Sequence, residues 1–254
     1  MTALTSWPYP LWLAHRGAGK LAPENTLAAF RAGAHHGYRG FECDVKLSAD
    51  GVPFLMHDAT LQRTTSGHGA SAEHTWDQLS RLDAGAWHSP AFAGEPLPRL
   101  DAVAQYCLEH GFALNLEIKP SPGHETETGR VVAAEAARLW TGQALQPLMS
   151  SFDARALASA RLAAPHLPRA LLLDQLPAAW LQQALDLQCV AIVCAHSLLD
   201  ADVIGRIHAA EMASLAYTVN EAGLARRLLD AGIDGLITDA VDRFAPDVPT
   251  SVSP

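Results

Sequence analysis

Short, mostly apolar runs alternate with longer stretches of helical spacing along nearly the whole chain. Runs of this kind are typical of strands that are buried on both faces of a parallel sheet. They predict strands at residues 11–14, 40–45, 113–118, 148–151, 170–173, 190–194, 215–219 and 235–238. Between them, apolar residues spaced three and four apart predict helices at residues 26–36, 100–110, 130–140, 154–163, 178–187, 202–210 and 221–231.

Helix-capping residues agree with several of these boundaries. Asn25-Thr26, Asp153, Asp200 and Asn220 stand where predicted helices begin, and such side chains satisfy free backbone N–H groups there. Eight strands that alternate with helices over 254 residues predict a closed TIM (β/α)8 barrel rather than an open doubly wound sheet. We therefore expect residues 1–254 to form a single barrel domain.

A hairpin is predicted directly after the second strand. A further strand-like run follows there, and Asp50-Gly51 between the two runs is a typical hairpin turn. A two-residue loop would place His57 opposite Asp44, and a four-residue loop would place it opposite Glu42. Both registers put the His57 side chain on the face of the two acidic residues.

The segment after this hairpin interrupts the alternation of strands and helices. It is polar and rich in Gly and Pro, and it holds only a short helical piece near residues 75–82. We expect residues 51–98 to be a small insertion in the second βα loop. Such loops lie at the C-terminal mouth of a barrel, where the sites of this fold are built.

Composition limits the partners and the location of the protein. A formal net charge of −9 argues against nucleic acid as a partner, because phosphate binding needs a basic face. No apolar run approaches the roughly 18–20 residues of a membrane span. Residues 1–10 lack the basic region of a signal peptide, so we expect a cytoplasmic protein without stable membrane association.

The four cysteines are Cys43, Cys107, Cys189 and Cys194. They lack the spacing of a zinc site or a disulfide framework and should be reduced thiols. The oligomeric state stays open.

Acidic residues mark two of the predicted strands. Glu42 and Asp44 lie two apart on one strand and therefore point the same way, and Glu117 lies near the end of the next strand of the barrel. Burying carboxylates among apolar neighbours is unfavourable unless they are paired or bind a cation. Oxygen ligands select hard divalent ions, so these residues predict one Mg²⁺ or Ca²⁺ at the mouth.

Basic residues and histidines end strands at the same mouth. Arg16 and Lys119 suit a phosphate group, and His15 and His57 suit proton transfer near neutral pH. Together with the acidic residues, they predict phosphoester cleavage. His196 follows the seventh strand and is a weaker candidate for the mouth.

Each of these patterns also has an ordinary structural explanation. Two acids on one strand are usually solvated or salt-bridged, and a lone His-Arg pair is a weaker signal still. Glu24-Asn25-Thr26 is explained by the start of a helix with Asn25 or Thr26 as its cap. The convergence of several patterns at successive strand ends favours a site over these explanations.

The chain resembles the glycerophosphodiester phosphodiesterase family. The resemblance runs from about residue 13 to residue 239 and keeps the order of the family's motifs. The matching stretches are His15-Arg16-Gly17, Pro23-Glu24-Asn25-Thr26, Glu42-Cys43-Asp44-Val45, Asp50-Gly51 through His57-Asp58, Arg63-Thr64-Thr65-Ser66-Gly67, Leu116-Glu117-Ile118-Lys119, Ser151-Phe152, Thr218-Val219-Asn220 and Asp234-Gly235-Leu236-Ile237-Thr238-Asp239.

This resemblance implies a barrel related to bacterial phosphatidylinositol-specific phospholipase C, with a small insertion after the second strand. It implies hydrolysis of small glycerophosphodiesters, such as glycerophosphocholine or glycerophosphoethanolamine, to sn-glycerol 3-phosphate and an alcohol. The implied roles are a metal site at Glu42, Asp44 and Glu117, general acid and base at His15 and His57, and phosphate contacts at Arg16 and Lys119. Tyr217 stands where the family often has Trp before Thr-Val-Asn, and we expect it to contact substrate.

Three other functions remain as alternatives. A phospholipase of C or D type would act on lipid or lysolipid, and a non-catalytic module would only bind phosphoesters. A glycosidase needs a carboxylate pair but neither the basic residues nor the two histidines. For hydrolysis itself, the sequence leaves open whether water or the glycerol 2-hydroxyl attacks, and which histidine is the acid.

Overall fold

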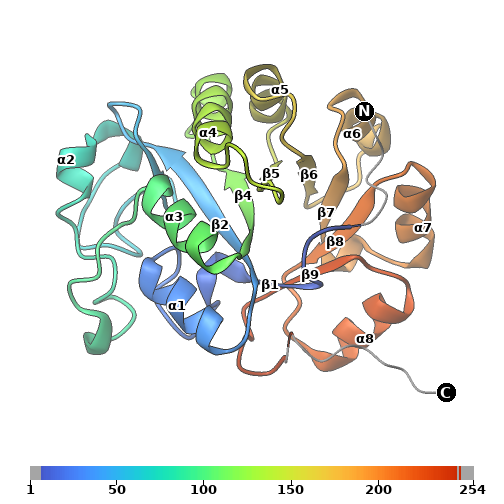
Figure 1. Cartoon of the computed structure of the whole chain (residues 1–254), viewed down its shortest axis with the longest axis horizontal. Helices are drawn as coiled ribbons and strands as arrows, with labels where there is room; N and C mark the ends of the chain where they lie inside the picture. The colour runs from blue at the N-terminus through green and yellow to red at the C-terminus, as the bar shows by residue number, and fades with distance from the viewer. Residues whose placement is uncertain (1–6, 245, 247–254) are drawn as a thin grey trace.

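Eight parallel strands close into a ring in the computed structural model, which describes residues 7–244 and residue 246 (Figure 1). In the order of the ring they are β1 (Trp12–Ala14), β2 (Gly40–Leu47), β4 (Ala113–Ile118), β5 (Leu148–Ser151), β6 (Arg169–Leu173), β7 (Ala191–Ala195), β8 (Ala213–Tyr217) and β9 (Gly235–Thr238). The first strand pairs with both β2 and β9, which closes the ring and confirms the predicted TIM (β/α)8 barrel. Residues 1–6, which carry part of the expectation of no signal peptide, lie outside the described residues.

Helices connect these strands and cover the outside of the ring (Figure 1). They are α1 (Leu27–His35), α3 (Leu100–His110), α4 (Glu125–Leu139), α5 (Ala154–Ala163), α6 (Trp180–Asp186), α7 (Ala201–Ala209) and α8 (Ala222–Asp230). The predicted caps Thr26, Asp153 and Asp200 accept hydrogen bonds from backbone N–H groups in the first turns of α1, α5 and α7. Within the described residues, no helix is both long enough and apolar enough to span a membrane.

One helix cap and one helix start differ from the prediction. The side chain of Asn220 does not cap α8; its amide oxygen instead accepts a hydrogen bond from the backbone N–H of Asp239, at 2.8 Å. Helix α4 begins at Glu125, well before the predicted start at residue 130. Its first turn carries Glu125 and Glu127, whose charges favour a helix N-terminus. A prediction based on the spacing of apolar residues misses such a polar first turn.

Apolar side chains fill the interior of the ring below its C-terminal mouth. This plug includes Leu13, Leu148, Leu172, Val193, Leu215 and Ile237. Alternate residues of a strand share a face, so the inward positions that follow the plug toward the mouth include His15, Glu117 and Tyr217. The apolar plug therefore forms the floor of the mouth, and the polar side chains lie directly above it.

The insertion after β2 adds elements outside the ring. It contains β3 (Pro53–Leu55), antiparallel to β2, and the short helix α2 (Trp76–Leu79), as the fold prediction expected. Figure 1 shows these elements beside the ring, next to the end of β2. They have an apolar cluster of their own that includes Phe54, Leu61 and Leu79. The bounds 51–98 and the assignment of residues 1–254 to one domain stay predictions.

Both predicted hairpin registers were wrong by one residue. The strands pair Val45 with Leu55, and the backbone N–H of Ser48 donates to the carbonyl of Val52, which leaves a three-residue loop. Gly51 ends this loop with a φ of +77°, the left-handed conformation that three-residue hairpin loops use. His57 still reaches the mouth, because β3 ends at Leu55 and the chain bends immediately afterwards.

The same substitution at two helical glycines should have opposite effects on stability. A β-carbon at Gly33 of α1 would lie 2.2 Å from the carbonyl oxygen of Gly17, in the loop after β1. Gly33→Ala should therefore lower the free energy of unfolding by about 1–3 kcal/mol, the usual cost of overpacking. At Gly205 of α7 the added carbon meets no atom within 4 Å, so Gly205→Ala should stabilise by about 0.5–1 kcal/mol. Urea denaturation measures both, and shifts of the same sign would contradict the close packing of α1 on this loop.

Candidate active site

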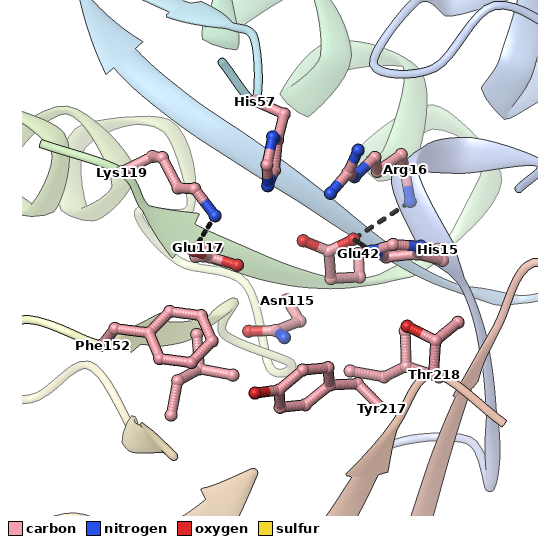
Figure 2. Close-up of a pocket in the computed structure, with 12 residues that line it drawn as sticks. His15, Arg16, Glu42, His57, Asn115, Glu117, Lys119, Phe152, Tyr217 and Thr218 are labelled. Carbon is pink, nitrogen blue, oxygen red and sulfur yellow. Dashed lines mark hydrogen bonds and ion pairs between the residues drawn. The ribbon is translucent and has the colours of Figure 1, made fainter. Parts of the chain in front are cut away.

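A cavity of about 180 Å³ opens at the C-terminal mouth of the ring (Figure 2). Of the predicted site residues, the structure places His15, Arg16, Glu42, His57, Glu117, Lys119 and Tyr217 around it. Asp44 is absent from this lining but belongs to the carboxylate group described next. His196, the weaker candidate, does not line the cavity.

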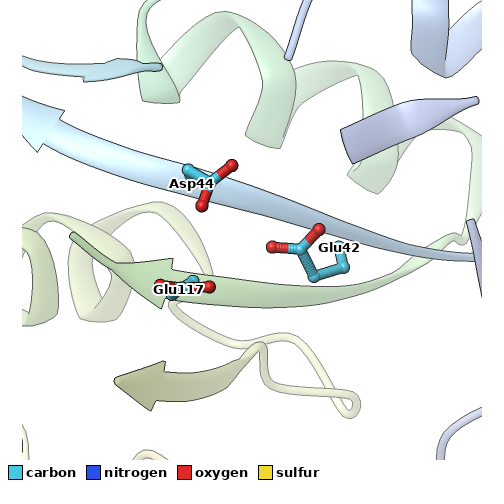
Figure 3. Close-up of side chains that lie close together, drawn as sticks. All are labelled: Glu42, Asp44 and Glu117. Atoms are coloured by element: carbon cyan, nitrogen blue, oxygen red, sulfur yellow. The ribbon is translucent and has the colours of Figure 1, made fainter. Parts of the chain in front are cut away.

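Three buried carboxylates lie together on two neighbouring strands (Figure 3). Glu42 and Asp44 come from β2 and Glu117 from β4, where Asp44 and Glu117 are direct partners in the parallel register. One oxygen of each carboxylate lies within 4.8 Å of the others. The exposed fractions of the three residues are 3%, 1% and 8%, so water does little to screen their repulsion.

The pKa values of the three carboxyls reflect this crowding. Burial, and then the charge of Asp44, raise the pKa of Glu117 to about 8 and that of Glu42 to about 6. Burial also opposes ionisation of Asp44, but the charges of Arg16 and Lys119 outweigh it and lower its pKa to about 2. Asp44 is therefore the carboxyl of the three that loses its proton most readily, and Glu117 is the one that loses it least readily.

Two basic side chains flank the carboxylate group. Lys119 Nζ donates to Glu117 Oε1 at 2.7 Å and lies 3.4 Å from Asp44 Oδ1. Arg16 Nε lies 3.3 Å from Asp44 Oδ2, while its Nη1 donates to Glu24 Oε1 at 2.8 Å. Both cations thus border the cavity and the acids at once, a position suited to a phosphate that bridges them.

The chemistry of the donor set fits a divalent cation. All the candidate ligands are carboxylate oxygens, which hard ions such as Mg²⁺ and Ca²⁺ prefer. Glu42 Oε2 accepts a hydrogen bond from the backbone N–H of Arg16 at 3.0 Å, whereas the buried Oε1 has no hydrogen-bond partner in the described part of the chain. A cation would satisfy that oxygen and offset the repulsion within the group.

His15 is held by a carboxylate at the end of the last strand. Its Nδ1 lies 2.6 Å from Asp239 Oδ1, and Asp239 Oδ2 accepts from Asn220 Nδ2 at 3.1 Å. An ionised carboxylate only accepts, so Nδ1 carries the proton and Nε2 is the nitrogen left for a ligand. Burial disfavours the charged ring, but the hydrogen bond to Asp239 raises the pKa of His15.

His57 has a matching support in the insertion. Its Nδ1 lies 2.7 Å from Asp58 Oδ1, which again leaves Nε2 for a ligand. Arg63 donates to both oxygens of Asp58, at 2.6 and 2.9 Å, and to both oxygens of Glu24, each at 2.8 Å. Because Glu24 also binds Arg16, one guanidinium connects the support of His57 with a predicted phosphate contact. Burial lowers the pKa of His57.

Aromatic rings form one wall of the cavity. The rings of Phe152 and Tyr217 meet edge to face, with centroids 5.8 Å apart. The Tyr217 hydroxyl donates to the carbonyl of Leu173 at 3.1 Å, so the ring rather than the hydroxyl is available to a ligand. Phe152 is 41% exposed and marks the solvent side of the wall.

Sequence reasoning assigned no role at the site to the residues that hold these side chains in place, although all of them stand in the motifs shared with the family. They are Glu24, Asn25, Asp58, Arg63, Asn220 and Asp239. Asn25 and Thr26 were the two candidates for a helix cap; Thr26 is the cap, whereas the Asn25 amide donates to Asp44 Oδ2 at 2.8 Å and accepts from the Asp44 backbone at 3.0 Å. Asp58 follows His57 directly and Asp239 follows a strand directly, and these two positions could have indicated that both residues belong to the site. The contacts of Arg63 and Asn220 depend on loops that no local pattern describes.

Comparisons with known proteins agree on one family. A model described as the glycerophosphoryl diester phosphodiesterase family matches residues 15–243. A glycerophosphodiester phosphodiesterase of Caldanaerobacter subterraneus subsp. tengcongensis is 32% identical over 234 residues, 90% of this chain and 93% of that protein. The structure of an Oleispira antarctica phosphodiesterase in complex with the product sn-glycerol-3-phosphate has a TM-score of 0.86 at 34% identity, over 92% of this chain and 95% of that one. A glycerophosphodiester phosphodiesterase structure from Agrobacterium tumefaciens gives 0.79 at 27% identity, over 93% and 99%.

Removing the Arg63 guanidinium, which binds both Asp58 and Glu24, should change which ring nitrogen of His57 carries the proton. In Arg63→Gln, no cation holds the Asp58 side chain in place, so Asp58 should turn away from His57 in part of the molecules, and the ring should no longer keep its proton on Nδ1 alone. Two-dimensional ¹⁵N NMR of the histidine rings reports this tautomer. The control is Arg81→Gln, which should leave His57 unchanged: Arg81 is an exposed arginine of the same insertion, just after α2, and within the described residues its ion-pair partner is Asp77. An unaltered Nδ1–H signal in Arg63→Gln would show that Arg63 does not hold His57.

Proposed function

The chain belongs to the glycerophosphoryl diester phosphodiesterase family, and we propose that it hydrolyses substrates such as glycerophosphocholine and glycerophosphoethanolamine to sn-glycerol 3-phosphate and an alcohol. The observation that carries this proposal is one cavity lined by two carboxylate-supported histidines, two basic side chains and members of a buried carboxylate group. The Oleispira antarctica phosphodiesterase supports the same product for this chain, since its structure contains sn-glycerol-3-phosphate as product.

We propose that Glu42, Asp44 and Glu117 hold one divalent cation, either Mg²⁺ or Ca²⁺. Such an ion, when bound, stabilises negative charge on phosphoryl oxygens. Arg16 and Lys119 act on the same charge from the protein, because both border the cavity beside the carboxylates. Fixed donors of this kind are effective, since they need no reorganisation as charge develops.

His15 and His57 each carry out one of the two proton transfers of the reaction. One histidine removes the proton of the attacking oxygen, and the other protonates the leaving alkoxide through its Nε2. The phosphorus bond to the attacking oxygen forms as the bond to the alcohol oxygen breaks. The attacking oxygen belongs to water, or to the glycerol 2-hydroxyl; in the second case a cyclic phosphate forms first and water then opens it.

Release of sn-glycerol 3-phosphate from glycerophosphocholine tests the reaction and its cation together. After EDTA treatment the purified chain should be inactive, and Mg²⁺ or Ca²⁺ should restore release. Glu117→Gln should lower the restored rate at least about a hundredfold. The exposed Glu109, at the end of α3, provides the control Glu109→Gln, which should match the parent chain.

The outcomes of that assay separate the alternatives. No release with either ion from folded protein would overturn the proposed reaction. Hydrolysis of lysolipid under those conditions would then assign a phospholipase-like function. Inactivity toward both substrate classes, together with binding of sn-glycerol 3-phosphate, would assign a non-catalytic binding module.

Variants of the two histidines test proton transfer. His15→Asn and His57→Asn should each lower kcat by at least about a hundredfold without loss of fold, because a positioned acid or base contributes about 10²–10⁴-fold. With a glycerol p-nitrophenyl phosphodiester, whose leaving group needs no proton, only one of the two variants should recover. The exposed His110 gives the control His110→Asn. Near-normal turnover in either histidine variant would remove that residue from the mechanism.

A further inference from the structure

The floor of the cavity holds a polar side chain to which the reaction above assigns no part. Asn115 of β4 is 1% exposed and lines the cavity. Figure 2 shows its amide between the carboxylates and Tyr217, facing the open space. In the described part of the chain, neither Oδ1 nor Nδ2 of this amide has a hydrogen-bond partner.

A buried amide without partners is unfavourable for folding, because it has lost its water and gained nothing in return. Leu172 and Ile237, which also line the cavity, are apolar and offer the amide no hydrogen bond. A leucine would fill the position of Asn115 with a similarly branched side chain and no unpaired polar groups. The missing partner of the amide therefore has to come from the cavity itself.

The chemistry of an amide restricts what that partner is. Oδ1 only accepts hydrogen bonds and Nδ2 only donates them. A phosphate at neutral pH chiefly accepts, and a quaternary ammonium does neither, so neither group satisfies both atoms. Hydroxyls donate and accept, and two adjacent hydroxyls would satisfy Oδ1 and Nδ2 together. In glycerophosphocholine and glycerophosphoethanolamine, the glycerol arm is the part that carries such a pair.

We propose that Asn115 binds the free diol of the glycerol arm and thereby sets the enzyme's specificity for glycerol. This proposal rests on the proposed function. Asn115 precedes Glu117 by two residues on β4, so it lies roughly 6–7 Å deeper along the strand than the carboxylate group. The glycerol arm therefore enters first and the alcohol points outward past the half-exposed Phe152. The structure thus favours strict recognition of glycerol and loose recognition of the alcohol.

The test compares two substrates in the parent chain and in Asn115→Leu. The first is glycerophosphocholine, and the second is 2-hydroxypropyl phosphocholine, which keeps the 2-hydroxyl and lacks only the terminal one. Because both keep the 2-hydroxyl, the comparison holds whichever oxygen attacks. The parent should prefer glycerophosphocholine in kcat/KM by about tenfold or more, since the shorter diester leaves part of the amide unpaired. Asn115→Leu should lose this preference through a fall on glycerophosphocholine, with the rate on the second substrate changed less than about threefold.

A second measurement separates binding from a structural role. Asn115→Leu should melt at the same temperature as the parent or higher in the absence of substrate, because it removes unpaired buried groups. A lower melting temperature, with both substrates hydrolysed more slowly by the same factor, would assign Asn115 to the framework and overturn the proposal. Weaker activation by Mg²⁺ or Ca²⁺ in the variant, again with both substrates equally affected, would assign Asn115 to the cation and overturn it too.

Failure of this proposal is distinguishable from failure of the proposed function. If the parent chain hydrolyses both diesters equally well and Asn115→Leu behaves the same, only the role of Asn115 is overturned. If the parent chain hydrolyses neither diester with either cation, the phosphodiesterase reaction itself is overturned.

Discussion

The repulsion among Glu42, Asp44 and Glu117 is the constraint around which the mouth of the barrel is arranged. Like charges this close, and this well shielded from water, oppose folding unless other groups offset them. Arg16 and Lys119 do so from either side, and the amide of Asn25 donates a hydrogen bond to Asp44, the carboxyl with the lowest pKa of the three. The grouping of three carboxylates opposes folding of the protein alone, and a bound divalent cation would offset their repulsion.

Closure of the ring, rather than any local segment, assembles the proton-transfer groups. Ala14 and Thr238 are partners where β1 meets β9, so the residues that follow them, His15 and Asp239, lie side by side although most of the chain separates them. His57 reaches the same cavity from the insertion, where Asp58 and Arg63 hold it. Each histidine thus depends on a carboxylate, one backed by a neutral amide and the other by a guanidinium.

The fold and much of the site were predictable because they depend on periodicity and on strand ends. The alternation of elements predicts the barrel, and residues at the C-terminal ends of parallel strands, such as His15 and Glu117, meet at one mouth whatever the loops do. Loop geometry is different. The hairpin register depended on one left-handed residue, Gly51, and the helix-capping pattern at Asn220 was indistinguishable from its actual contact with Asp239. Such contacts join distant segments, so no local spacing records them.

We propose that the buried carboxylates hold a cation at the point where phosphate binds. Mn²⁺, which also prefers oxygen ligands, makes this claim measurable by electron–nuclear double resonance. We expect one Mn²⁺ per chain, with a coupling to the ³¹P nucleus of added sn-glycerol 3-phosphate that places the phosphate directly beside the ion. Mn²⁺ that binds without this coupling, or that binds equally well to the combined variant Glu42→Gln, Asp44→Asn and Glu117→Gln, would contradict it.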